Sequence, residues 1–456
     1  MNIDTLQSVY FIGAGGIGMS ALVRYFLLKG KFVAGYDRTP SHLTEQLIQE
    51  GAHLHFQEEV AQIPLRCKDK EHTLIIYTPA IPATHTELHY FRQEGFTIMK
   101  RAEVLGMLTR TEKGLCVAGT HGKTSTSTLT AHLLHASHVG CNAFLGGISR
   151  NYNTNLLFSA ESEYVVIEAD EFDRSFHHLR PYATVITSTD ADHLDIYGTH
   201  EAYLESFSHY ASLVTEGGHL IVKKGVQLSI PTEKSIHVWS YGIEQGDFRA
   251  TNIRIANETI IFDYISPLGN IADIELGVPI YVNIENGVAA MALAQIAGVS
   301  PEEIKTAMAS FRGIERRFDF RLRTPAHIVL SDYAHHPEEL KQSIHSLRQL
   351  YPTRKLTGVF QPHLYSRTRD FYPAFAESLS LLDEVILLDI YPARELPIEG
   401  VSSQLIFDCL KSGVQKHLCR KEDLVATIQT CNPEVLMVLG AGDVDNYVAP
   451  IIEVLR

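Results

Sequence analysis

Apolar runs of strand length alternate with amphipathic segments of helix length along most of the chain. Such alternation is typical of mostly parallel sheets with helical crossovers, so the sequence predicts an α/β fold. In the first part of the chain the pattern predicts strands at 9–12, 32–36, 73–77 and 97–99 and helices ending near Lys29 and spanning 102–108.

The same alternation continues through the middle and the end of the chain. The middle part has expected strands at 115–118, 164–168 and 183–189 and expected helices at 127–136 and 286–296. The last part has expected strands at 327–331, 355–360, 384–389 and 435–439. Between 218 and 280 shorter alternating runs, such as 258–264, predict a small antiparallel sheet within the middle part.

The chain is too long for one hydrophobic core. Its 456 residues favour two or three domains. A polar stretch at 109–114 and an arginine-rich stretch at 311–323 predict the limits of three: 1–108, 109–315 and 316–456.

Composition narrows the class of protein. With 45% hydrophobic and 20% charged residues the chain is typical of a globular protein, and a net charge of −14 argues against broad binding to nucleic acid or anionic membranes. The six cysteines contain no Cys-x-x-Cys pair, which favours reduced thiols in the cytoplasm. No export signal and no apolar run of about 18 residues is visible, so we expect no membrane insertion.

A phosphate-binding turn is predicted directly after the strand at 115–118. Its residues are Gly119, Thr120, His121, Gly122, Lys123, Thr124 and Ser125. The following helix would point its N-terminus at bound phosphate, Lys123 would neutralise charge, and the Thr124 hydroxyl would ligate Mg²⁺. Val117 stands where a standard Walker A motif has its first glycine, so the match is imperfect.

A second glycine-rich turn follows the first predicted strand. It comprises Gly13, Ala14, Gly15, Gly16, Ile17 and Gly18, and Asp37 ends the next strand. This pattern is typical of a turn that binds a diphosphate. It does not distinguish NAD, FAD and a UDP-sugar, and a tight turn without a ligand is the plainer alternative.

Acidic residues end two strands of the middle part. Glu168 closes one strand, and a run at 190–195 that contains His193 closes the next. Ligands of open α/β sheets bind at this edge, and carboxylate oxygens suit Mg²⁺ held against nucleotide phosphates. Because carboxylates surround His193 in the sequence, it is a stronger candidate for a metal ligand than an isolated surface histidine.

Two strand ends in the last part also carry polar side chains. Asp332 and His335 follow one strand, and His363 and Arg367 follow another, which predicts a third edge that faces a ligand. The pair at 316–317 reads, from position alone, as a solvated basic linker.

Taken in order, these motifs resemble those of the Mur ligases of peptidoglycan synthesis. The matching segments are GAGGIGMS at 13–20, GTHGKTS at 119–125, EADEFD at 168–173, DADHLDIY at 190–197, 316–318, DYAHHP at 332–337, QPHLYSRT at 361–368 and GAGD at 440–443. The family uses a shorter phosphate loop, so the resemblance explains Val117. It departs at Leu364, where many relatives have arginine, and at Phe172 and Arg174, which replace small residues.

The resemblance implies three α/β domains: a UDP-binding domain, an ATPase domain and a domain like a dinucleotide-binding fold. It implies roles for single residues, carried over by position. Lys123 and Thr124 would hold ATP phosphates and magnesium, and Glu168 and His193 would ligate the metal. Asn286 would lie near adenine, Arg317 near the terminal phosphate and Asp332 near the nucleotide. Three residues of the last part would approach the reacting carboxylate or the amine: His335, His363 and Arg367.

The activity implied by the resemblance is ATP-dependent ligation of L-alanine to the carboxylate of UDP-N-acetylmuramate through an acyl phosphate. Later members of the family use a carbamylated lysine after the metal-binding histidine, and no lysine lies between His193 and Val222, which favours the alanine-adding member. Another amino-acid or peptide ligase of the family stays an alternative. An NAD-dependent oxidoreductase would leave the phosphate loop unexplained, and a phosphotransferase would need no amino acid.

Overall fold

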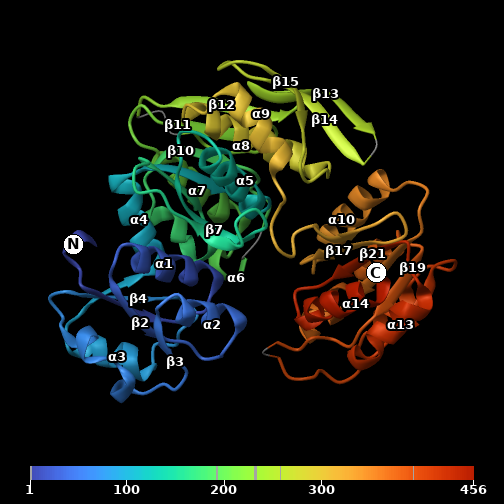
Figure 1. Ribbon diagram of the computed structural model, residues 1–456, viewed down its shortest axis with the longest axis horizontal. Helices are drawn as coiled ribbons and strands as arrows, with labels where there is room; N and C mark the ends of the chain where they lie inside the picture. Colours follow the sequence, from blue (N-terminus) through green and yellow to red (C-terminus); the bar gives the residue numbers. More distant parts are fainter. Residues whose placement is uncertain (1–2, 192–193, 231–233, 257, 394) are drawn as a thin grey trace. The chain divides into compact units, whose positions relative to one another are not determined.

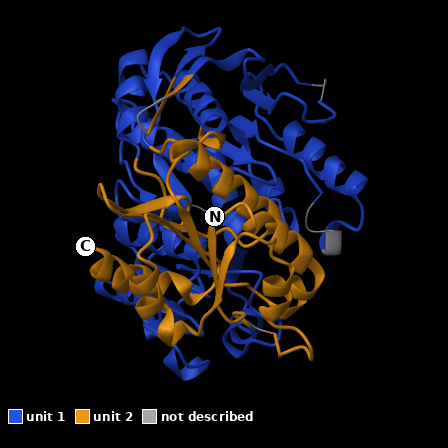
Figure 2. Ribbon diagram, turned by 90° about the vertical axis from the view of Figure 1, so that its right-hand side faces the viewer, with its two compact units in different colours: residues 1–253, 262–277, 284–311 blue, residues 254–261, 278–283, 312–456 orange. Residues whose placement is uncertain are grey.

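The computed structural model describes residues 3–191, 194–230, 234–256, 258–393 and 395–456. The chain forms three mostly parallel sheets with flanking helices, which confirms the predicted α/β class (Figure 1). By residue contacts it divides into two compact units, 1–253 with 262–277 and 284–311, and 254–261 with 278–283 and 312–456 (Figure 2). The first two sheets thus share a unit, and the predicted domain limits at 108 and 315 stay predictions. No helix among the described residues is long and apolar enough to cross a membrane.

The first sheet has the strand order β3-β2-β1-β4-β5, and its neighbours pair in parallel. Its strands are β1 (Ser8–Ile12), β2 (Phe32–Tyr36), β3 (His53–His55), β4 (Thr73–Tyr77) and β5 (Thr97–Lys100). Its helices are α1 (Ile17–Leu28), α2 (His42–Gln49), α3 (Thr86–Gln93) and α4 (Arg101–Thr111), with short 3₁₀ turns at Ile3–Thr5, Val60–Gln62 and Leu65–Lys68. Every residue of β1 is buried, because this strand lies in the middle of the sheet with helices on both faces.

The second sheet has ten strands in the order β15-β14-β13-β12-β11-β10-β6-β9-β7-β8. They are β6 (Lys113–Ala118), β7 (Asn142–Ser149), β8 (Thr154–Leu157), β9 (Tyr164–Glu168), β10 (Pro181–Ile186), β11 (His219–Lys223), β12 (His237–Ile243), β13 (Phe248–Ala256), β14 (Thr259–Ile265) and β15 (Ile271–Glu275). The accompanying helices are α5 (Lys123–His135), α6 (Leu194–Tyr197), α7 (His200–Ser212), α8 (Val282–Ile296) and α9 (Pro301–Ser310), with a 3₁₀ segment at Phe172–His178.

Two details of this sheet differ from the prediction. The strands expected to form a small antiparallel sheet in the middle part are continuous with the central sheet, and the first of them, β11 and β12, join it in parallel. Helix α5 begins at Lys123, before the expected 127, because Gly122 in a left-handed conformation turns the chain directly into the helix. The threonines and serines of the first turn obscure this start in the sequence pattern.

The third sheet has the order β16-β17-β21-β18-β19-β20, in which only the β16–β17 pair of the described strands is antiparallel. Its strands are β16 (Asp319–Arg323), β17 (Ile328–Asp332), β18 (Leu356–Phe360), β19 (Glu384–Leu387), β20 (Gln415–Leu418) and β21 (Val435–Leu439). Its helices are α10 (Pro337–Leu350), α11 (Tyr365–Leu379), α12 (Gln404–Cys409), α13 (Leu424–Cys431) and α14 (Val448–Leu455), with 3₁₀ turns at Lys421–Asp423 and Asp443–Tyr447.

A buried arginine ties the first sheet to the second. Arg24 of α1 is 7% exposed and donates hydrogen bonds to Glu50 after α2 and to Asn155 on β8. Asn155 in turn donates to the carbonyl of Ile17 at the start of α1. Because a buried charge is costly to leave unpaired, this network fixes the start of α1, and with it the glycine turn, against the second sheet.

Candidate active site

The phosphate loop has the backbone that its glycines predict. Gly119 and Gly122 have φ angles of +136° and +78°, and a Cβ atom at Gly119 would lie 2.0 Å from the Thr187 hydroxyl. At Gly122 it would lie 2.9 Å from the side-chain oxygen of Asn286. Asn286 also accepts a hydrogen bond from Thr126, at 3.2 Å, so its position in this structure is against the loop. Its predicted place near adenine stays a prediction.

Lys123 folds back over the loop that precedes it. Its ammonium donates to the carbonyl oxygens of Gly119 at 2.6 Å and Thr120 at 3.3 Å, and to the Glu171 carboxylate at 2.9 Å. The Glu171 side chain is 1% exposed, and burial raises its pKa while the nearby ammonium opposes that shift. Sequence reasoning gave Glu171 no separate role, although its place in the run after Glu168 was visible.

Two of the predicted metal ligands lie together. The Thr124 hydroxyl donates to Glu168 at 3.1 Å, because the start of α5 and the end of β9 meet at one edge of the sheet. Gly146 on β7 leaves room for this carboxylate, since a Cβ there would lie 2.1 Å from a Glu168 oxygen. A hydroxyl and a carboxylate are the oxygen donors that Mg²⁺ prefers, so the donor set fits this ion. His193, the third predicted ligand, lies outside the described residues.

The glycine turn at 13–18 is closed by Asp37. The backbone N–H of Gly15 donates to the Asp37 carboxylate at 2.6 Å, and Gly13 has a φ angle of +89°. Asp37 therefore stabilises the turn itself, whichever ligand the turn binds. Helix α1 starts directly behind Gly16 and has no side-chain cap, so its first N–H groups suit an anion.

Arg101, which the sequence analysis did not single out, lies against this turn. A Cβ at Gly18 would come within 2.3 Å of its guanidinium, and the guanidinium also lies 3.7 Å from the Asp170 carboxylate. Arg101 opens α4 directly after β5, at the same edge of the sheet as the glycine turn. The position of this basic residue directly after a predicted strand could therefore have indicated that it lies at the ligand-binding edge of the sheet.

One cavity of about 270 Å³ joins the two predicted sites of the first unit. It is lined by Gly16, Ile17, Gly18, Met19, Thr78, Arg101, Phe144, Leu145, Gly146, Glu168 and Asp170. The glycine turn and the carboxylate beside the phosphate loop thus open into the same space. A ligand whose diphosphate rests on the turn can extend its other end toward Glu168.

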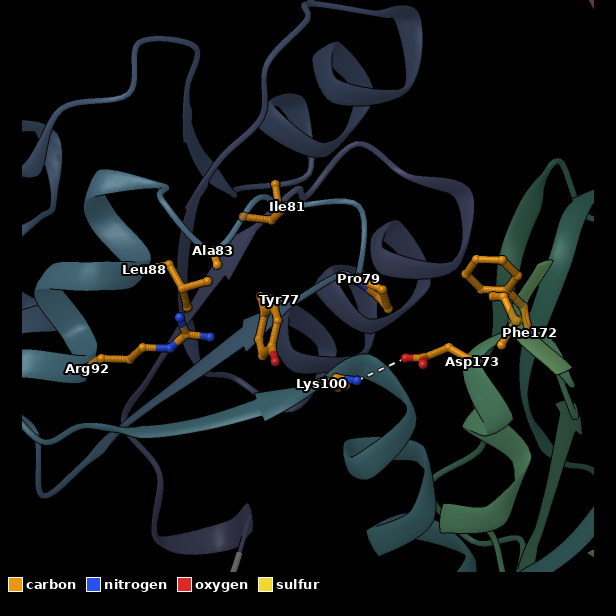
Figure 3. A pocket seen from close by; sticks show the side chains of 10 residues that line it. Tyr77, Pro79, Ile81, Ala83, Leu88, Arg92, Lys100, Phe172 and Asp173 are labelled. Atoms are coloured by element: carbon orange, nitrogen blue, oxygen red, sulfur yellow. Dashed lines mark hydrogen bonds and ion pairs between the residues drawn. The ribbon is translucent and has the colours of Figure 1, made fainter. Parts of the chain in front are cut away.

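A second cavity, of about 370 Å³, also adjoins the end of β4, where Tyr77 and Pro79 line it (Figure 3). Its lining residues are Tyr77, Pro79, Ile81, Ala83, Leu88, Arg92, Lys100, Phe172, Asp173 and Ile196. Lys100 pairs with Asp173 at 2.9 Å across this cavity, as the dashed line in Figure 3 shows. Phe172, one of the three departures from the family pattern, contributes an exposed ring to this lining. Arg174, another departure, lies 4.7 Å from the centre of the Tyr197 ring.

Three predicted residues of the second unit meet beyond the ends of β17 and β18. The rings of His335 and His363 are 6.1 Å apart, and Arg367 lies 3.4 Å from Nδ1 of His363. Burial lowers the pKa of His335, and the nearby Arg367 adds to this, whereas Glu339 opposes it. His335 is therefore neutral near pH 7 and able to accept a proton.

The two neighbouring arginines, Arg316 and Arg317, make different contacts. Arg316 donates to the carbonyl oxygens of Gly440 and Gly442, each at 3.0 Å, so it holds the chain in place. Arg317 is exposed, with its guanidinium 5.4 Å from the Tyr333 ring. Asp332 is 7% exposed, accepts a hydrogen bond from Ser343, and has its pKa raised by burial. Its predicted contact with nucleotide stays a prediction.

The chain also matches known protein families along most of its length. Residues 8–113 match the Mur ligase family, catalytic domain; 117–294 match the Mur ligase middle domain; and 316–442 match the Mur ligase, glutamate ligase domain. The chain belongs to the Mur ligase family.

Individual relatives are similar over all or nearly all of their length. The chain is 65% identical to the UDP-N-acetylmuramate–L-alanine ligase of Phocaeicola vulgatus, with 100% of both chains covered. It is 52% identical to the enzyme of that name from Porphyromonas gingivalis strain W83, with 99% of each covered. Among solved structures, the UDP-N-acetylmuramate-alanine ligase of Thermotoga maritima has 25% identity and a TM-score of 0.82, with 98% of each chain covered.

Proposed function

We propose that this chain is an ATP-dependent ligase that joins L-alanine to the lactyl carboxylate of UDP-N-acetylmuramate, a step in peptidoglycan precursor synthesis. The observation that carries the proposal is the single cavity that the glycine turn shares with Glu168. A UDP-sugar on the turn would bring its carboxylate toward the phosphate loop. The two named relatives that bear this enzyme's name cover 100% and 99% of the chain.

The chemical problem is that a carboxylate is a poor acyl donor. Phosphorylation by ATP gives an acyl phosphate and ADP, attack by the alanine amine gives a tetrahedral intermediate, and loss of inorganic phosphate leaves the amide. Phosphoryl transfer depends mostly on position and on neutralisation of charge. Lys123 supplies positive charge to the β- and γ-phosphates by leaving its contacts with Gly119 and Thr120.

Magnesium would be held by Thr124, Glu168 and His193, and would neutralise charge on the transferring phosphate. Glu168 already accepts from the Thr124 hydroxyl, so these two donors need little movement to share an ion. Glu171 keeps the Lys123 ammonium at the loop, at 2.9 Å, when no phosphate is bound.

The diphosphate of the UDP-sugar would rest on the residues at 13–18, with Arg101 as its cationic partner. We assign the amine step to the histidine pair of the second unit. His335 is neutral and can take a proton from the alanine ammonium, while Arg367 can hold a carboxylate. Arg317, which is exposed, is the proposed partner of the terminal phosphate.

The direct test is an assay of products with the purified chain, ATP and Mg²⁺. We expect ADP, phosphate and an amide only when UDP-N-acetylmuramate and L-alanine are both present. A tripeptide or D-glutamate in place of L-alanine separates the other amide ligases of the family from this one. NAD reduction, or phosphoryl transfer that never yields an amide, would overturn the proposal.

A further inference from the structure

Three side chains of types that commonly bind transition metals lie close together at the third sheet. They are Glu384 at the start of β19, His417 on β20 and Cys431 at the end of α13. One ligand atom from each lies within 4.8 Å of the other two. In the part of the chain that the structure describes, no second trio of His, Cys, Asp or Glu side chains comes this close.

The sequence places these side chains on one face of the sheet. Glu384 pairs with Gln415 and Ile386 pairs with His417, so Glu384 and His417 point to the same side by the two-residue period of strands. Helix α13 covers that face, since its Leu424 and Ile428 belong to the same buried cluster as Ile386. Cys431 follows Leu424 by two helical turns and therefore lies on the helix stripe that faces the sheet.

The distances suit a tetrahedral metal site. Nε2 of His417 lies 3.1 Å from Oε1 of Glu384. Ligand bonds of about 2.0–2.1 Å to nitrogen and oxygen and about 2.3 Å to sulfur put neighbouring ligand atoms roughly 3.3–3.6 Å apart. Small rotations of His417 and Cys431 would therefore open the group enough to surround an ion.

The glutamate is already oriented for this role. Its other oxygen, Oε2, accepts from Lys355 at 3.0 Å and from Thr357 at 3.1 Å, while Oε1 faces His417. Partners of this kind fix a ligating carboxylate and compensate its charge. The Glu384 side chain is only 5% exposed, so its direction is set by the fold.

We propose that Glu384, His417 and Cys431 bind Zn²⁺ or a similar divalent transition metal, with water as the fourth ligand. The metal–sulfur bond forms as the Cys431 thiol loses its proton to solvent. The site lies at the start of β19, whereas His335 and His363 follow the other ends of parallel strands, so it is separate from the proposed ligase site. A bound ion would join α13 to β19 and β20 and stabilise this edge of the domain.

Cobalt titration of the full-length, metal-free protein tests the site, because Co²⁺ bound by a thiolate has a charge-transfer absorption band. Excess Mg²⁺ is included to occupy oxygen sites. We expect one equivalent of Co²⁺ to give the band, Cys431→Ser to abolish it, and His417→Gln to weaken cobalt binding at least tenfold. Cys409→Ser, which removes an exposed cysteine elsewhere, should leave the band unchanged.

Zinc should also raise the melting temperature of the parent and of Cys409→Ser, but not of Cys431→Ser, because only a folded state that binds the ion is stabilised. His417→Gln lies at a half-exposed position and gives a second variant if Cys431→Ser does not fold. Absence of the band in the parent protein, or a band that persists in Cys431→Ser, would overturn the proposal. Either result leaves the proposed ligase activity untouched.

Discussion

At the scale of single residues, Lys123 makes the most informative contacts, since its ammonium bridges the phosphate loop and the buried Glu171. We expect Lys123→Ala to lower kcat by about 10²–10³-fold, because charge that develops on the transferred phosphate loses its partner. Steady-state release of phosphate measures this effect.

The matched control is Lys113→Ala, which removes the lysine at the start of β6, the strand that leads into the phosphate loop. The ammonium of Lys113 pairs with Glu163 at the surface. Its kcat should stay within twofold of the parent. Calorimetry should show unchanged affinity of Lys123→Ala for UDP-N-acetylmuramate, because the glycine turn is a separate site. A Lys123→Ala enzyme near the parent rate would remove this residue from the mechanism.

The pH dependence of the reaction should report on His335. Its pKa is lowered from the usual 6.5, mainly by burial, so the ring stays neutral to a lower pH than an exposed histidine does. If His335 accepts the alanine proton, kcat/KM should fall as the pH drops, with a midpoint below 6.5.

His335→Gln should abolish that acidic limb and lower the rate of amide formation by about 10²-fold or more. The comparison variant is His363→Gln, since the two rings are only 6.1 Å apart. An acidic limb that persists in His335→Gln but disappears in His363→Gln would give the proton-accepting role to His363.

At the scale of elements, the turn between β6 and α5 depends on Gly119. Alanine there would have a strained φ of +136° and would place Cβ 2.0 Å from the Thr187 hydroxyl. We expect Gly119→Ala to lower the free energy of unfolding by about 1–3 kcal/mol from strain alone and to weaken ATP binding further through displacement of the loop.

Gly225→Ala separates these two effects, because Gly225 has a φ of +92° with nothing within 4 Å of the added Cβ. It should lower the melting temperature slightly and leave the KM for ATP unchanged. Equal KM values for ATP in both variants would show that the position of the loop does not control nucleotide binding.

The hydrophobic pattern predicted most elements of the sheets well. Strands β2, β4, β9 and β21 have the predicted limits, because each is a short buried apolar run between polar turns. The pattern missed the start of α5, where backbone conformation at Gly122 decides the boundary. It also separated the strands after 218 from the central sheet, since alternation shows one exposed face but does not identify the neighbouring strand.

At the scale of the whole molecule, residues that join distant parts of the chain were the hardest to predict. Arg24 and Asn155 are 131 positions apart, and Arg101 lies between the glycine turn and Asp170. Neither arginine belongs to a motif with fixed spacing. The motif residues themselves, such as Lys123 and Glu168, could be placed because strand ends of a parallel sheet share one edge.

Arg101 offers a test of which cavity receives the UDP-sugar. Arg101→Gln should raise the KM for UDP-N-acetylmuramate about tenfold or more, equivalent to roughly 1.5–3 kcal/mol for a charged hydrogen bond. Arg92→Gln, which changes the lining of the other cavity, should leave this KM within twofold. The reverse order of effects would place the diphosphate away from the glycine turn.

The central claim is that ATP activates the sugar carboxylate as an acyl phosphate before alanine attacks. The most direct measurement uses UDP-N-acetylmuramate with ¹⁸O in its lactyl carboxylate, followed by ³¹P NMR of the products. The account predicts that an ¹⁸O atom from the carboxylate is transferred to inorganic phosphate in each turnover that yields an amide. Inorganic phosphate without label, or label recovered in AMP, would contradict it.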